Sequence, residues 1–414
     1  MSEGIPQRER AIVFLIGAVQ FINILEFVMV MPMGPDFASG LGIPLSNVGL
    51  IGGGYTAAAS VAGVVGSYFL DRFDRRKALA VCMLGLVVGT AAGGLATGLY
   101  SLMAARVLAG VFGGPATSLS LAIIADVVPV ERRGRAMGAV MGAFAVASVV
   151  GVPIALELAQ WGGWRLPFFL VAGVGLLLVA SAIFFLPPIR GHLEASQRPA
   201  HRVTVRELFS RTDVQLSYCM TAVLNMGGFL VIPHISAYLQ HNLGFPRDKL
   251  GQIYLVGGIV SFLTLRVSGK LVDRLGSFRV GTVGTVLILG TMYLAFLAPP
   301  PWMPVLVIFS GFFLANGVRN VSHSTLTSRV PEQSLRARFM SFQSAVQHMA
   351  AAVGAFLSSK MLLDLPDGRL EGLSQVVLLS MGLTLTLPVL MYAVEKRLLA
   401  RDQAGKLAAP LAAP

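Results

Sequence analysis

The chain has 414 residues, of which 55% are apolar and only 13% are charged, against about a quarter charged in ordinary soluble proteins. These few charged residues could not cover the surface of a soluble protein of this length, so the composition excludes that class. The formal net charge of +12 raises the question of nucleic-acid binding, which the placement of the basic residues answers below.

Long apolar runs along the chain predict an all-α membrane protein with twelve transmembrane helices. Runs of about 20 apolar residues match a hydrocarbon core of about 30 Å. The first run is too long for the apolar part of a signal peptide and no small-residue cleavage site follows it, so we expect a membrane helix there. The predicted helices fall near 11–33, 46–70, 77–97, 100–126, 136–158, 165–187, 216–239, 249–269, 279–298, 302–328, 339–362 and 373–394. Arg106 and Arg319 should lower the hydropathy of the fourth and the tenth.

The basic residues indicate the orientation of these helices. If the N-terminus is cytoplasmic, 24 of the 32 Lys and Arg residues lie in cytoplasmic segments and 4 lie in the outer loops. This bias follows the positive-inside rule. Because the basic residues line one membrane face in short loops, nucleic acid is excluded as a partner. We expect a multi-pass protein of the inner (plasma) membrane, with both termini cytoplasmic and the lipid bilayer as its surroundings.

An internal repeat divides the chain. Asp71-Arg72, Val128-Pro129 and Gly49 recur as Asp273-Arg274, Val330-Pro331 and Gly251, each 202 residues later. Three matches at one offset predict a duplicated unit of six helices, inserted in parallel because six is even. We expect an N-terminal bundle at 1–188, a cytoplasmic linker at 189–213 with a short surface helix near 203–209, a C-terminal bundle at 214–396 and a tail at 397–414. Parallel repeats place a solute site at their interface, near the midplane.

Local motifs resemble the major facilitator superfamily. The segments that follow helices 2 and 8, Ser67–Lys77 and Gly269–Gly276, resemble its signature loop, and Arg106–Gly114 resembles its helix 4 motif. Asn23–Pro35 resembles helix 1 of the drug and sugar efflux branch (drug:proton antiporters and arabinose-efflux-permease-like proteins). A further set resembles the helix 5 motif of antiporters: Gly138, Gly142, Gly151 and Pro153.

The resemblance implies a secondary transporter that works by alternating access as a monomer. The predicted function is proton-coupled efflux of a small organic solute, with uptake or facilitated diffusion by the same fold as the alternative. An enzyme is not expected, since we find no phosphate-binding loop, metal-ligand cluster or Ser/His/Asp set, and no cofactor is implied. Cys82 and Cys219 lie in apolar runs, where we expect them to pack rather than form a disulfide.

One pair of charges is predicted at equal depth in the membrane. Glu26 and Arg106 each lie about six residues from the outer end of their helix, about 9 Å deep. A charge at this depth needs a partner or water. Two interpretations are open: Glu26 is a titrating carboxylate that carries the coupling proton, or the two form a permanent ion pair that orients helices 1 and 4.

Helix 10 carries one polar stripe. Its members follow a helical face: Asn316, Arg319, Asn320, His323 and Thr327. The stripe contacts substrate in one interpretation, with Arg319 favouring an anionic or polyhydroxylated group, and makes hydrogen bonds between helices in the other. The weaker substrate-cavity candidates are Gln20, Asn23, Asn225, Gln343 and Gln347.

Acidic residues among the cytoplasmic arginines suggest a conformational latch. Ion pairs that form in one state bias alternating access, and the resemblance implies that this network stabilises the outward-facing state. The proposed members are Asp71, Arg72, Arg75, Arg76, Asp126, Arg135, Asp273 and Arg274. Plain positive-inside anchoring would explain the arginines but not the acids. In helix 5, Gly142, Gly151 and Pro153 suggest a gate or hinge, and close packing is the alternative.

Overall fold

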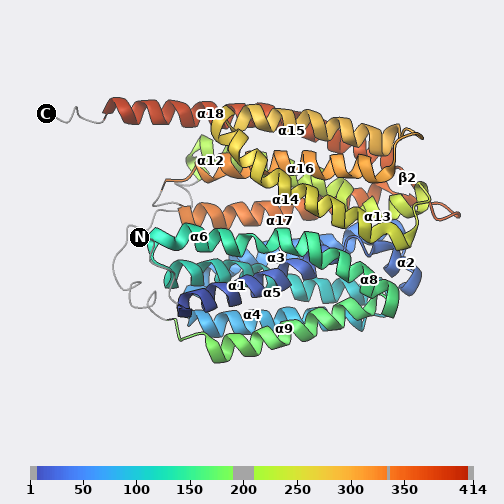
Figure 1. Cartoon of the computed structure of the whole chain (residues 1–414), viewed down its shortest axis with the longest axis horizontal. Helices are drawn as coiled ribbons and strands as arrows, with labels where there is room; N and C mark the ends of the chain where they lie inside the picture. The colour runs from blue at the N-terminus through green and yellow to red at the C-terminus, as the bar shows by residue number, and fades with distance from the viewer. Residues whose placement is uncertain (1–6, 190–208, 333–335, 409–414) are drawn as a thin grey trace.

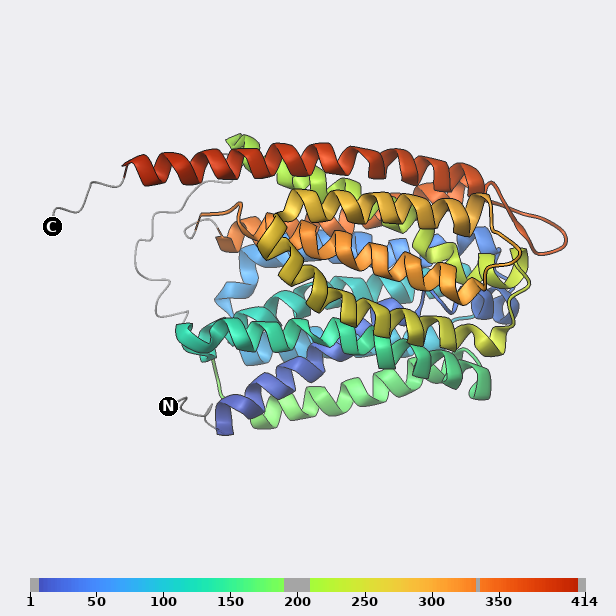
Figure 2. The same ribbon diagram turned by 45° about the horizontal axis from the view of Figure 1, so that its top comes forward.

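The computed structural model describes residues 7–189, 209–332 and 336–408. Its helices run roughly parallel to one long axis, and both marked chain ends lie at the same end of the molecule (Figures 1 and 2). Among the described residues, eleven helices have the length and hydropathy to cross a membrane. The prediction of an all-α membrane protein is thus confirmed.

The twelfth predicted span is α17, Arg336–Met361, which has 26 residues but is less apolar than the others. It packs against α3, Val48–Phe69, and α12, Thr212–Val231. Because these helices cover part of α17, some of its polar side chains, such as Gln343 and Ser358, are buried. The helices that contain Arg106 and Arg319 are both among the eleven, and the helix with Arg319 has the lowest mean hydropathy of the set.

We call the helices before residue 190 the first half. Its remaining elements are α1 (Gln7–Met29), α2 (Gly34–Leu41), η1 (Leu45–Asn47), η2 (Leu70–Arg72), α4 (Arg75–Gly94), α5 (Leu99–Val127), α6 (Val130–Met141), α7 (Ala143–Val146), η3 (Ala147–Gly151), α8 (Val152–Gly162) and α9 (Arg165–Phe185). Helix 5 of the prediction is therefore divided into α6, α7, the π-helical η3 and α8.

The helices after residue 208 form the second half. Its further elements are η4 (Ile232–His234), α13 (Ile235–Ala237), η5 (Tyr238–Asn242), η6 (Arg247–Lys249), α14 (Leu250–Leu275), α15 (Ser277–Met292), η7 (Tyr293–Leu297), α16 (Val305–Ser328), β1 (Leu363–Asp364), β2 (Leu370–Glu371) and α18 (Leu373–Ala408). The two short strands pair antiparallel, with Leu363 opposite Glu371.

Each half is held together by its own helices. In the first half α5 packs against α3 and α4, and α9 packs against α1 and α4; in the second, α16 packs against α14 and α15, and α12 against α18. Two seams join the halves, α3 against α17 and η3 with α8 against α14. The predicted boundaries at 188 and 214 stay a prediction: most of the linker, with its expected helix near 203–209, lies outside the described residues. The tail expected from 397 instead begins as part of α18, which continues to Ala408.

Glycines permit the close approach of α3 and α5. A Cβ atom at Gly114 would lie 2.6 Å from the carbonyl oxygen of Ala59, and one at Gly110 would collide with the carbonyl of Tyr55. Small residues at such crossings let two membrane helices pack backbone to backbone. The approach matters because α5 carries Arg106 and α3 carries Tyr55, which meet below.

Candidate functional site

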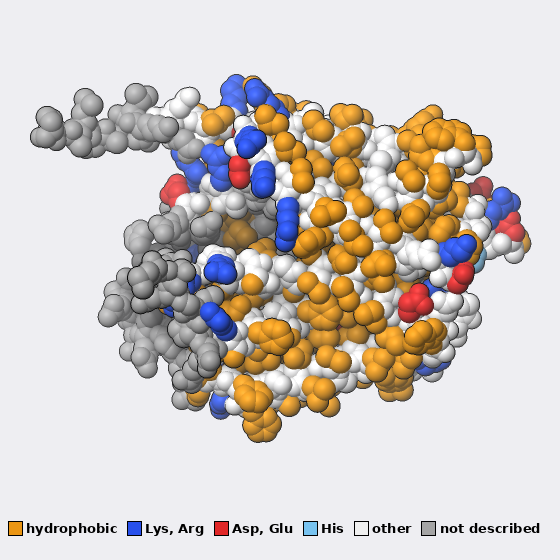
Figure 3. Space-filling view, viewed as in Figure 1, with side chains coloured by type: hydrophobic (Ala, Val, Ile, Leu, Met, Phe, Trp, Pro, Cys, Tyr) orange, Lys and Arg blue, Asp and Glu red, His pale blue; other side chains and the backbone are white. Residues whose placement is uncertain are grey.

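The two ends of the molecule differ in charge and in packing. Lys and Arg side chains gather at the end where α1 begins, and hydrophobic side chains cover the middle (Figure 3). We call this end the basic end and the opposite one the far end.

Polar contacts at the far end bridge the two halves. Arg247 of η6 forms a bidentate ion pair with Asp36 of α2, and both N–O distances are 2.9 Å. The same guanidinium donates to the carbonyl of Leu156 on α8 at 3.2 Å. Across the other seam, the backbone N–H and hydroxyl of Ser46 donate to the Asp364 carboxylate at 3.1 and 2.5 Å. The far end is therefore closed by direct contacts between the halves.

Several ion pairs at the basic end join residues of the same half. Arg75 pairs with Asp126 at 3.2 Å, and Arg132 pairs with Glu9 at 2.9 Å, all in the first half. Asp74 accepts from the backbone N–H groups of Arg76 and Ile189 at 3.0 and 3.3 Å. In the second half, Arg211 pairs with Asp213 at 2.9 Å and with Glu332 at 2.6 Å.

The predicted latch residues take different positions. Arg75 and Asp126 meet, and Arg76 donates to the carbonyl of Leu186 at 3.2 Å. Asp273, Arg274 and Arg135 are exposed and make no ion pair with any described residue. Arg72 is exposed as well, while the side chain of Asp71 lies outside what the structure describes.

Glu26 and Arg106 form a buried ion pair between α1 and α5. The Nη1 group of Arg106 donates to the Glu26 carboxylate. The side chain of Arg106 is 1% exposed and that of Glu26 is 0% exposed. The Arg106 guanidinium also lies over the ring of Tyr55, 4.7 Å from its centre. A cation over an aromatic face is stabilised by the ring quadrupole, so three helices hold this arginine.

A chain of hydrogen bonds continues from Tyr55. Its hydroxyl donates to Asn23 Oδ1 at 3.3 Å, and the Asn23 amide donates to Thr117 Oγ1 at 2.7 Å and to the Gly113 carbonyl at 3.0 Å. Several polar atoms of the cluster have no hydrogen-bond partner in the structure: Glu26 Oε2, Arg106 Nε and Nη2, and Gln20 Oε1. The second carboxylate oxygen can therefore take a proton without breaking an existing bond.

Arg319 of α16 is buried in the second half without a carboxylate partner. Its guanidinium donates to Asn316 Oδ1 at 3.0 Å and to Thr384 Oγ1 of α18 at 3.4 Å. No described Asp or Glu pairs with it, and Nε has no partner. Beside it lies a cavity of about 10 Å³ that Asn316 and Ser380 also line. That volume is about the size that holds one water molecule.

The other stripe residues bond to neighbouring helices or face outward. His323 Nε2 lies 3.0 Å from Thr221 Oγ1 of α12, and Gln343 of α17 donates to the same hydroxyl. Asn225 donates to the Thr221 carbonyl at 2.8 Å. Asn320 and Gln347 are exposed. Two stripe residues, Arg319 and His323, therefore bond to neighbouring helices, and the two interpretations of the stripe both stay open.

The structure gives the predicted helix 5 residues separate surroundings. A Cβ atom at Gly138 would meet nothing, and one at Gly142 only its own helix, whereas one at Gly151 would lie 2.7 Å from Leu25 of α1. Pro153 lies in the first turn of α8, directly after the π-helical η3. Among the described residues, no group of His, Cys, Asp and Glu could hold a metal ion.

Sequence reasoning missed the residues that close the far end and those that surround the charges. Asp36, Arg247 and Asp364 are single loop charges, for which the sequence shows no pairing signal. Tyr55 and Thr384 lie in apolar runs, where an aromatic or hydroxyl side chain usually packs. One sequence signal could have indicated that Tyr55 lies near Arg106. The small residues of Arg106–Gly114 predict that another helix packs closely against this segment, and that helix is α3.

Comparison with known proteins decides the family. The chain matches the Major Facilitator Superfamily over residues 16–355 and again over 221–406. It belongs to this superfamily. It is therefore a multi-pass membrane transporter of small molecules and not an enzyme, and the predicted resemblance is confirmed.

Similar proteins include two named for drug resistance. The chain is 26% identical to a chloramphenicol resistance protein of Streptomyces lividans, over 83% of this chain and 87% of the relative. It is 25% identical to a homolog of the multi-drug resistance efflux pump PmrA of Lactococcus lactis, over 81% and 84%. These names describe the relatives.

Solved structures share the superfamily fold. A bacterial homolog of the human lysosomal transporter Spinster, in an inward-facing and unoccupied conformation, aligns with a TM-score of 0.74 at 15% identity, covering 96% of this chain and 99% of that one. A D-xylose-proton symporter aligns with a TM-score of 0.75 at 16% identity, over 92% and 97%. At these identities the likeness concerns the fold alone.

Proposed function

We propose that this transporter is a proton-coupled antiporter, which exports a small organic solute across the plasma membrane. The observation that carries the proposal is the buried pair of Glu26 and Arg106, which places a carboxylate with one unpartnered oxygen inside the membrane. Intramembrane carboxylates commonly mark proton relays. The relatives named for drug resistance support a drug-like solute and export.

The orientation follows from the basic residues. If the basic end is cytoplasmic, as we propose, the closed far end faces outward, which supports an inward-facing state. Opening the far end would break the Asp36–Arg247 pair and the bonds of Ser46 to Asp364. Closing the basic end would bring its charged loops together, which is where the latch residues Asp71, Arg72, Asp273 and Arg274 would act. The break in helix 5 at Gly151 and Pro153 would let α6 move while α8 stays on α14.

The coupling step uses the unpartnered oxygen of Glu26. A proton on Oε2 would neutralise the carboxylate and weaken its hold on Arg106, and with it the link between α1 and α5. Release of that proton would restore the pair. Because the two charge states of Glu26 favour different arrangements of α1 and α5, proton binding and conformational change are linked.

Arg319 supplies the complementary feature in the second half. A buried cation that is bonded only to neutral groups gains most from a ligand with negative charge or strong acceptor oxygens. We assign the solute contact in the second half to Arg319 and Asn316, which line the cavity, and we propose Asn23 and Gln20 as further contacts in the first half. The transporter is proposed to act as a monomer.

The direction of proton coupling separates this proposal from its alternatives. Purified protein in proteoliposomes would be given labelled chloramphenicol and, in parallel, D-xylose and a panel of small solutes. Solute uptake is measured with an acidic lumen, an acidic medium or equal pH, since these conditions distinguish the mechanisms whichever way the protein inserts. Vesicles without protein control for passive entry of the solute.

Antiport predicts accumulation above equilibrium only when the lumen is acidic. Accumulation driven by an acidic medium would contradict export by antiport and indicate proton-coupled uptake. Equilibration at one rate under all three conditions would contradict proton coupling and indicate facilitated diffusion.

A further inference from the structure

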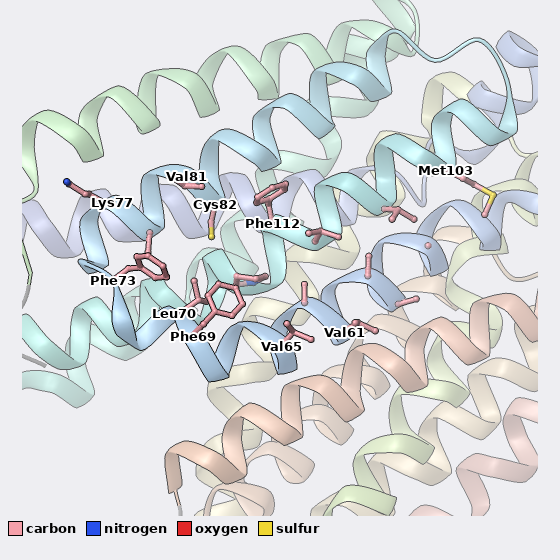
Figure 4. Close-up of a pocket in the computed structure, with 18 of the residues that line it drawn as sticks. Val61, Val65, Phe69, Leu70, Phe73, Lys77, Val81, Cys82, Met103 and Phe112 are labelled. Carbon is pink, nitrogen blue, oxygen red and sulfur yellow. The ribbon is translucent and has the colours of Figure 1, made fainter. Parts of the chain in front are cut away.

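A long apolar groove runs along the first half, away from the buried charges (Figure 4). It has a volume of about 870 Å³ and is formed by α3, α4 and α5, with Phe356 of α17 at its rim. Many of its lining side chains are exposed, among them Val61, Val65 and Val81. Because the chain spans a membrane, such an exposed apolar surface faces the bilayer.

The groove is long enough for a lipid chain and has a charge at one end. Its α3 wall extends from Gly54 to Phe69, a rise of about 22 Å, which exceeds the half-thickness of about 15 Å of the hydrocarbon core. Lys77 lies at the basic end of the groove, and Met103 lies at its opposite end (Figure 4). Among the described residues of the lining, Lys77 alone is charged, and it is exposed.

The internal repeat shows that three small residues of the groove have larger counterparts in the second half. Gly54, Ala57 and Ala58 line it, and the residues 202 positions later are larger: Val256, Ile259 and Val260. The basic residue is kept, since the position that matches Lys77 is Arg279. The groove is thus made by small side chains that the second half lacks.

We propose that this groove binds one acyl chain of an anionic phospholipid, whose phosphate pairs with the ammonium group of Lys77. The lipid belongs to the leaflet at the basic end, and its chain lies along α3 over Val107 and Val111 of α5. An acyl chain in the bilayer is already out of water, so the hydrophobic effect does not favour the groove over the surrounding lipid. The preference for the groove comes from close packing of the chain against it. The headgroup preference comes from the charge of Lys77, because a basic residue at the membrane surface attracts anionic lipids.

Competition between two lipids tests the proposal. Purified full-length protein would be mixed with equal amounts of phosphatidylglycerol and phosphatidylcholine, and retained lipid would be counted by native mass spectrometry. We expect one phosphatidylglycerol to be retained in preference. Lys77→Gln should reduce that preference about fivefold, the equivalent of one basic residue at the surface. Ala57→Ile/Ala62→Phe, which fills the groove, should abolish retention of both lipids.

The second half supplies matched controls. Arg279→Gln removes the basic residue at the repeat position of Lys77, and Leu263→Phe adds bulk at the repeat position of Val61. Both should leave lipid retention unchanged, and thermal unfolding checks that every variant is folded. Equal retention of the two lipids by the unaltered protein would overturn the proposal. So would a loss of retention that is as large in the controls as in the groove variants.

Discussion

Each half of the transporter buries one arginine, and the two differ in what neutralises them. Arg106 is paired with Glu26 and covered by Tyr55, whereas Arg319 has only Asn316 and Thr384. They also differ in depth, since Arg106 lies seven residues from the far end of α5 and Arg319 nine residues from the basic end of α16. The first charge is neutralised within the protein by a carboxylate. The second is buried and bonded only to neutral groups.

The largest effect is expected when the paired charge loses its partner. Glu26→Gln keeps the shape but leaves Arg106 as an unpaired buried cation, which should lower the free energy of unfolding by about 3–5 kcal/mol. It should also abolish solute accumulation driven by an acidic lumen, while exchange of labelled for unlabelled solute continues. Denaturation and vesicle uptake measure the two effects.

The double variant Glu26→Gln/Arg106→Met separates stability from coupling. Removing both charges should restore most of the lost stability, because no unpaired charge is left, yet accumulation should stay absent. Gradient-driven accumulation at the normal level in Glu26→Gln would show that the pair only orients α1 and α5.

The next largest effect concerns the cation without a carboxylate. Arg319→Gln leaves no unpaired buried carboxylate, whereas Arg106→Gln leaves Glu26 unpaired. The free energy of unfolding should therefore fall far less in Arg319→Gln than in Arg106→Gln. The KM for the transported solute should rise about tenfold or more, as expected for the loss of one hydrogen bond from a charged donor. Arg319→Lys keeps the charge but not the planar group, so its KM should lie between those of the unaltered protein and Arg319→Gln. An unchanged KM in Arg319→Gln would place the solute elsewhere.

A smaller effect is expected at the seam above the paired charge. Asp36→Asn weakens a partly exposed ion pair, and such pairs contribute up to about 1 kcal/mol, so the ratio of closed to open far ends should fall at most about fivefold. Distances between spin labels at Ser39→Cys and Lys360→Cys, with both native cysteines replaced, report this ratio. Asp248→Asn is the control, because Asp248 is exposed beside Arg247 and makes no ion pair with any described residue. An equal shift in both variants would contradict a specific role for Asp36.

The smallest effect comes from a neutral partner of Arg319. Thr384→Val removes one hydroxyl acceptor, and hydrogen bonds between membrane helices average about 0.6 kcal/mol, so the KM should change about threefold. Thr386→Val is the matched control, since that exposed hydroxyl donates only to the carbonyl of Leu383 in its own helix. A tenfold change in Thr384→Val would indicate that the hydroxyl contacts solute directly.

Much of the fold could be predicted because the bilayer imposes a strong and local rule. Apolar runs predicted most of the helices, but α17 shows the limit of that rule. Hydropathy depends only on the residues of a segment. The burial of α17 against α3 and α12 depends on the assembled fold. The depth argument brought Glu26 and Arg106 together correctly, since both positions are counted along helices from a common surface.

Contacts between distant segments could not be predicted in the same way. Arg247 finds Asp36 across 211 residues through the packing of two halves, and either charge alone looks like any loop residue. The helix 10 stripe showed that a polar face exists, but its neighbours Thr221 and Thr384 follow from how α12 and α18 pack against α16. Their hydroxyl groups carry no sequence signal of their own.

The π-helical segment Ala147–Gly151 has a geometric consequence for helix 5. Such a segment is equivalent to an α-helix with one inserted residue. Since each α-helical residue advances the direction of its side chain by about 100°, the insertion sets the angular phase of α6 relative to α8. Deleting one residue there would rotate every side chain of α6 by about a quarter turn about the helix axis while α8 kept its register. The inserted residue therefore determines which face of α6 packs against α1 and α5.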